Sequence, residues 1–129
     1  MTKVKHESLN FIVPLVVYPF DVLVSLGQTD EELKNVIAKY GVEWSDNMKI
    51  VGQGLFYMNP ENQSIIRLKN VPVSCIDFGF LHHEIFHATT FILDRMGMKL
   101  ALLKSDEAYA YLNQFLVVEI YKKLPWYKK

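Results

Sequence analysis

The sequence lacks the cysteines from which a disulfide framework is built. Cys75 is the single cysteine in 129 residues, so no disulfide can form within the chain. Such sparing use of cysteine is typical of a reducing compartment, and no clear cleavage site follows the apolar run near the N-terminus. We therefore expect a cytoplasmic protein, with Cys75 as a small buried core residue rather than a thiolate held at a metal.

The sequence also lacks an excess of charge of either sign. Lysine and arginine number 14, aspartate and glutamate number 14, and the formal net charge is zero. No global field therefore attracts nucleic acid or an anionic membrane surface, and neither is expected as a partner. Basic residues gather only in the C-terminal stretch 121–129, which is either a contact site or a solvated terminus.

No uninterrupted apolar run is long enough to predict a membrane span. The most hydrophobic stretch, residues 11–27, is broken by Pro14, Pro19 and Asp21. Half of the residues are nonetheless hydrophobic, a share typical of a chain that folds around a core. We expect residues 1–129 to form a single domain without internal repeats or low-complexity segments.

Four segments carry local signals of secondary structure. The valine-rich and proline-rich residues 11–26 favour one strand or a pair of short strands. A capping box of Thr29 and Glu32 predicts a helix that ends at Gly41. Two β-like runs between residues 48 and 68, separated by a turn-forming Asn-Pro-Glu-Asn sequence, predict a hairpin.

Two helices are expected to complete the fold. The first spans about 81–96, with Asp77 as a candidate N-terminal cap, and the second runs from Ser105 to Pro125. The order of strand, helix, hairpin, helix and helix predicts an α+β fold. In it, helices pack on one face of a small antiparallel sheet.

Three of the four histidines cluster in the expected first helix, at positions 82, 83 and 87. Residues 83–87 read His-Glu-Ile-Phe-His, the pattern in which two histidines one helical turn apart bind zinc and the intervening glutamate acts as general base. Positions i and i+4 share a helix face, so the imidazoles of His83 and His87 can reach one ion. Glu84 points about 100° away and can reach a water on that ion.

Catalytic zinc usually has three protein ligands, and Glu107 is the best candidate for the third. It lies in the first turn of the next helix, which an antiparallel helix pairing would bring back toward the beginning or middle of the histidine helix. Along that second helix it shares an expected inward-facing stripe with Tyr111, Gln114 and Val118. The alternative is that Glu107, like its neighbour Asp106, is an acidic residue that favours the helix N-terminus electrostatically.

The His-Glu-Ile-Phe-His pattern followed by "DEAYAYLNQFL" resembles the zincin metallopeptidases, in the gluzincin-like arrangement with a downstream glutamate. It is similar to the small ImmA/IrrE-type peptidases and to short zincin-like proteins of tailed bacteriophages. The matched region covers about residues 80–123. The resemblance implies zinc bound by His83, His87 and Glu107, with Glu84 as general base.

The resemblance also implies a way of holding substrate. Zincin sheets commonly offer an edge strand that aligns an extended peptide, and residues 64–70, "SIIRLKN", are the nearest counterpart. The pattern departs from a fully equipped peptidase because no residue is clearly assigned to stabilise the oxyanion. Tyr109 and Tyr111 are candidates, with a core position as the alternative reading of each.

Two functions follow as hypotheses. The first is a zinc-dependent peptidase acting on a protein or peptide substrate, in the host cytoplasm or in a virion if the chain is encoded by a phage. The second is a non-catalytic protein that keeps the fold as an interaction or structural module of a phage particle, with metal serving only stability. In either case the C-terminal helix and tail are candidate contacts for a protein partner or a second copy.

Overall fold

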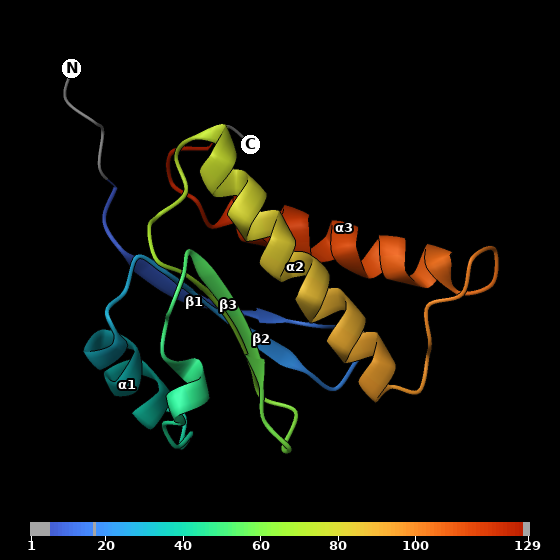
Figure 1. Ribbon diagram of the computed structural model, residues 1–129, viewed down its shortest axis with the longest axis horizontal. Helices are drawn as coiled ribbons and strands as arrows, with labels where there is room; N and C mark the ends of the chain where they lie inside the picture. The colour runs from blue at the N-terminus through green and yellow to red at the C-terminus, as the bar shows by residue number, and fades with distance from the viewer. Residues whose placement is uncertain (1–5, 17, 128–129) are drawn as a thin grey trace.

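The computed structural model describes residues 6–16 and 18–127, so Lys128 and Lys129 of the basic C-terminal stretch lie outside the described residues. Figure 1 shows a sheet with two long helices lying across it. The strands are β1 (Leu9–Pro14), β2 (Asp21–Leu26), β3 (Gly54–Met58) and β4 (Ser64–Leu68). The helices are α1 (Asp30–Ala38), the short 3-10 helix η1 (Asp46–Met48), α2 (Cys75–Arg95) and α3 (Asp106–Lys122).

The sheet has the strand order β1-β2-β4-β3. The expected α+β class, the two N-terminal strands and the hairpin between residues 48 and 68 are confirmed, since β1 pairs antiparallel with β2 and β3 with β4. The all-antiparallel sheet is wrong, because β2 and β4 run parallel. Turn sequences predict pairing within each hairpin, whereas pairing between distant strands depends on the path of the whole chain.

This strand order corrects the expected edge strand. Residues 64–68 form β4, which lies between β2 and β3 and is buried along its whole length. The two edge strands are β1 and β3, and the five residues of β3 are all half-buried. Strand β3 contacts α2, and its outer backbone edge is not paired with a strand of the described chain.

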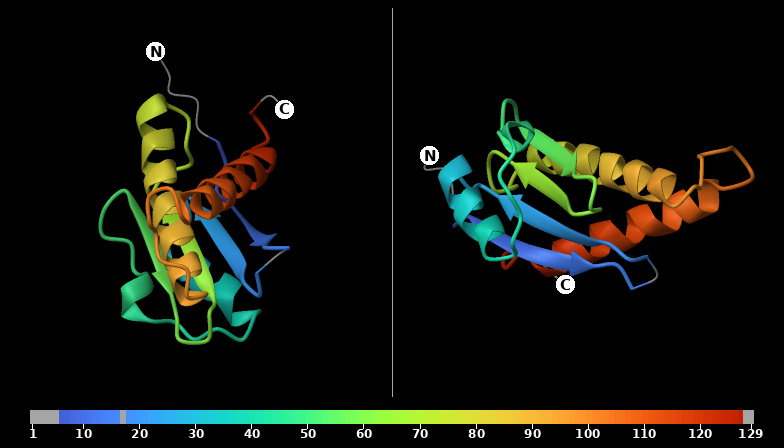
Figure 2. Two further views of the ribbon diagram at one scale, coloured as in Figure 1. Left: turned by 90° about the vertical axis from the view of Figure 1, so that its right-hand side faces the viewer. Right: turned by 90° about the horizontal axis from the view of Figure 1, so that it is seen from below.

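Helices lie on both faces of the sheet, not on one. Figure 2 shows α2 and α3 side by side over one face and α1 against the other. Successive side chains of β2 point to opposite faces of the sheet. Val22 and Val24 pack into the core under α2 and α3, while Leu23 packs against α1. Among the described residues, no helix has the length and apolarity to cross a membrane.

The helix predicted from the capping box of Thr29 and Glu32 is confirmed as α1. Both hydrogen bonds of the capping box are formed. A buried arginine attaches this helix to the sheet. Arg67 of β4 is fully buried and donates to Asp30 Oδ1 at 2.6 Å, to the Met48 carbonyl at 2.7 Å and to the Gln28 carbonyl at 2.9 Å. One guanidinium thereby ties α1 and η1 to the centre of the sheet.

Helix α2 begins earlier than expected. Its N-cap is Ser74, whose side chain accepts from the Asp77 backbone, while the Asp77 carboxylate accepts from the Ser74 backbone. Asp77 is thus the third residue of a capping box and not the cap itself. The spacing of Ser74 and Asp77 in the sequence could have predicted this capping box and the earlier helix start. Because of the earlier start, residues 83–87 lie in the middle of α2 and not in its first turn.

Candidate metal centre

The two histidines of the motif converge as their spacing predicts. The Nε2 atoms of His83 and His87 lie 3.2 Å apart, and the ring centroids are separated by 4.8 Å with the planes at 79°. His83 is exposed and His87 is half-buried, so the pair faces outward from α2. Without a metal, one ring can donate a hydrogen bond to the other, depending on the tautomers.

Glu84 completes a group of three possible ligands. One oxygen of its carboxylate and one ring nitrogen of each histidine all lie within 4.8 Å of one another. Unlike the histidines, Glu84 is buried, with 7% of its surface exposed. The three side chains therefore form a site with an open imidazole side and an enclosed carboxylate.

Burial gives the Glu84 carboxyl an unusual proton affinity. Removal from water raises the pKa of Glu84 above its ordinary value, and the positive charges that His83 and His87 carry when protonated lower it in part. A raised pKa makes the carboxylate a better proton acceptor than an exposed glutamate. This is the direction that a general base near neutral pH requires.

Apolar packing holds this part of α2 in place. Leu81, Ile85, Ala88 and Ile92 are fully buried against the sheet and α3. Phe86, within the motif, is 55% exposed, because the helix buries only a narrow stripe of this segment. Phe91 extends the histidine face toward the sheet, with its ring 6.4 Å from His87 and 5.5 Å from Phe56 of β3.

The structure does not bring Glu107 into this group. Helices α2 and α3 run antiparallel, with His82 Nε2 2.8 Å from Tyr121 Oη and Thr89 Oγ1 3.3 Å from Asn113 Oδ1. Glu107 is exposed, beyond Asn113 and away from His82 along α3. The connection between the end of α2 and the start of α3 spans residues 96–105. Figure 1 shows it as the long orange loop that separates the two helix ends.

The face of α3 that carries Glu107 also differs from expectation. The stripe of Glu107, Tyr111, Gln114 and Val118 is exposed. The buried stripe consists of Tyr109, Leu112, Leu116 and Ile120. Apolar residues occur on more than one face of α3. The face that is buried is the one that packs on β1 and α2. The role of Glu107 as a ligand stays a prediction that this arrangement does not support.

The remaining candidate residues also lie outside the group. His82 hydrogen-bonds Tyr121 of α3. Tyr109 is buried and donates its hydroxyl to the Met98 carbonyl at 2.5 Å, and Tyr111 is exposed on the outer face of α3. Cys75, expected in the core, is exposed at the first residue of α2.

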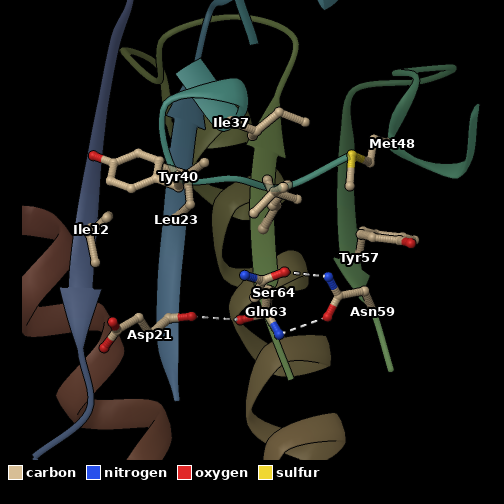
Figure 3. A pocket seen from close by; sticks show the side chains of 12 residues that line it. Ile12, Asp21, Leu23, Ile37, Tyr40, Met48, Tyr57, Asn59, Gln63 and Ser64 are labelled. Carbon is tan, nitrogen blue, oxygen red and sulfur yellow. Dashed lines mark hydrogen bonds between the residues drawn. The ribbon is translucent and has the colours of Figure 1, made fainter. Parts of the chain in front are cut away.

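A separate hollow of about 250 Å³ lies on the α1 side of the sheet (Figure 3). Its walls include the apolar Leu23 and Ile65, and its polar end includes Asp21, Asn59 and Gln63. Asn59 Nδ2 donates a hydrogen bond to Gln63 Oε1 at 2.6 Å. No histidine is among the residues of the described chain that line this hollow, and the sheet separates it from α2.

No protein-family model, curated protein or solved structure matches this chain. The resemblance to zincins therefore rests on the sequence pattern. What the fold adds is the convergence of His83, Glu84 and His87 beside an edge strand.

Proposed function

We propose that this protein is a zinc-dependent peptidase in which His83 and His87 hold the ion and Glu84 is the general base. The observation that carries the proposal is the 3.2 Å separation of the two Nε2 atoms. Two nitrogens at about 2.0–2.1 Å from a tetrahedral zinc ion are about 3.3 Å apart. The imidazoles therefore already have the spacing that a shared zinc ion requires.

Glu84 supplies the proton transfer. A bound zinc ion would polarise water and lower its pKa toward neutrality. Glu84 accepts the proton that this water gives up and delivers it to the departing amine nitrogen. Its enclosed position beside the histidines keeps the carboxylate within reach of solvent held at that pair while shielding it from bulk water.

Strand β3 supports a peptide as the substrate. As an edge strand of the sheet it has backbone donors and acceptors that no other strand of the described chain pairs with, and it packs against α2. An extended peptide can hydrogen-bond to such an edge as an added strand. Because Phe56 of β3 contacts Phe91 and Phe91 contacts His87, a chain lying along β3 passes close to the histidine pair.

A second candidate function is a non-catalytic interaction protein of the same fold. The observation that favours it is the position of Glu107, which leaves the described chain with only two histidines and the proposed base at the site. A zinc ion with two protein ligands would bind more weakly than one with three. In a catalytic form, one of the two further positions of a four-coordinate ion would be filled by water and the other by water or by a side chain of a bound protein.

The two functions are separated by metal content and by turnover. Protein purified without chelator should contain close to one zinc ion per chain by elemental analysis. Incubation with a broad peptide library should give cleavage products by mass spectrometry, and Glu84→Gln should retain the metal and lose the products. Equal product patterns for wild type and Glu84→Gln would leave the interaction protein as the explanation, and metal-free wild type would reject the peptidase.

A further inference from the structure

The Glu84 carboxylate lies against the first residue of the edge strand, Gly54. A β-carbon built on Gly54 would lie 2.9 Å from Glu84 Oε2 and 3.0 Å from Glu84 Cγ. Both distances are shorter than ordinary contacts between carbon and its neighbours, at about 3.5–4.0 Å. The Glu84 side chain can therefore occupy its position only because residue 54 has no β-carbon.

Backbone conformation does not explain this glycine. Gly27, Gly41 and Gly97 have positive φ angles, which side chains disfavour, whereas Gly54 does not. Gly54 lies in a regular antiparallel pairing opposite Leu68, in a register that accepts any residue. The constraint at Gly54 is the space taken by Glu84 and, at 3.1 Å, by Leu68 Cδ2.

We propose that Gly54 is a positioning residue for the metal centre, which fixes the Glu84 carboxylate beside His83 and His87 by leaving it room against β3. This inference rests on the proposed function. The nearest obstructed atom is the terminal oxygen of a side chain with rotatable bonds, so an added methyl group displaces the carboxylate more readily than it disrupts the fold. The effect of Gly54→Ala should therefore fall mainly on the site.

The chain offers a matched control two residues away. A β-carbon built on Gly52 meets no atom of the described residues within 4 Å. Gly52 lies just before β3, two residues from Gly54. Gly54→Ala and Gly52→Ala thus add the same methyl group and remove the same backbone freedom from the unfolded chain. Only the first touches Glu84.

The contact itself is tested in metal-free protein by thermal unfolding of a double-mutant cycle. Gly54→Ala should lower Tm in the wild type and lower it less, by about 2 °C or more, in a Glu84→Ala background, because the obstructing carboxylate is gone. Gly52→Ala should shift Tm equally in both backgrounds. Equal shifts for Gly54→Ala in the two backgrounds would overturn the contact, whether or not the protein binds metal.

The positioning role is tested in cobalt-loaded protein. Gly54→Ala should alter the visible absorption bands of bound Co²⁺ and reduce kcat on a cleaved peptide by about 10- to 100-fold with KM nearly unchanged, as expected when a reacting group is displaced by about 1 Å. Gly52→Ala should match the wild type in both. Unchanged bands in Gly54→Ala would reject the positioning role, while absence of Co²⁺ and Zn²⁺ binding by the wild type would reject the proposed function itself.

Discussion

Glu107 lies in the first turn of α3, whereas His83 lies near the middle of α2. Thr89, two residues after His87, contacts Asn113 of α3, and Glu107 precedes Asn113 by six residues, about 9 Å along a helix. A carboxylate side chain spans only a few ångströms, so it cannot bridge that separation while the two helices stay in register.

From this separation we predict that Glu107→Ala leaves zinc affinity unchanged. The measurement is competition of the purified protein against a coloured chelator. Asp106→Ala, which alters the adjacent, half-buried acid in the same first turn, is the control. A loss of affinity in Glu107→Ala as large as that caused by removing a histidine would show that α3 rearranges when metal binds.

The histidine pair should determine metal binding, and His82 should not. His87→Ala is expected to weaken zinc binding by more than about 100-fold, since it removes a direct ligand. His82→Ala removes a neighbouring imidazole that hydrogen-bonds Tyr121, so it should keep zinc affinity and lose about 0.5–1.5 kcal/mol of stability. Calorimetric titration with zinc and urea unfolding measure the two effects. Similar zinc affinities for the two variants would contradict the assignment.

Glu84→Gln should stabilise the metal-free protein at neutral pH. Burial raises the pKa of Glu84, so the ionised carboxylate is less favourable in the folded chain than in the unfolded one. The gain, about 0.5–2 kcal/mol, is complete above the folded pKa and disappears as pH falls through the unfolded value of about 4.3. Urea unfolding in the presence of a chelator checks this, and a neutral-pH loss of stability would contradict it.

Asp30→Asn should have the opposite pH dependence. The hydrogen bond from Arg67 lowers the pKa of Asp30, so the ionised side chain stabilises the folded state above the unfolded pKa of about 3.9. At neutral pH the variant should lose about 1–3 kcal/mol, because Arg67 stays buried with a weaker partner. The difference from wild type should shrink as pH falls through the folded pKa of Asp30.

Glu31→Gln is the control for that experiment. Glu31 lies in the same first turn of α1 but is exposed and pairs with Lys34 at 3.1 Å. An exposed pair of this kind contributes only about 0.3–0.5 kcal/mol. A loss in Glu31→Gln equal to that in Asp30→Asn would show that helix-end charge, and not the buried arginine, explains the effect.

Features that depend on residues close together in the chain could be predicted before the fold was known. The capping box at Thr29, the turn after Met58 and the pairing of His83 with His87 each involve residues within a few positions, where helix and turn geometry set the distances. The sequence pattern also predicted the α+β class, because the order of elements follows from local periodicity.

Which segments meet depended on the tertiary structure. The parallel pairing of β2 with β4 leaves β3 at an edge of the sheet. Packing on the sheet turns the Leu112 face of α3 inward and the Glu107 face outward, and the approach of α2 to β3 places Glu84 against Gly54. These contacts join residues far apart in the chain, and their choice depends on the burial of the whole apolar surface rather than on any local spacing.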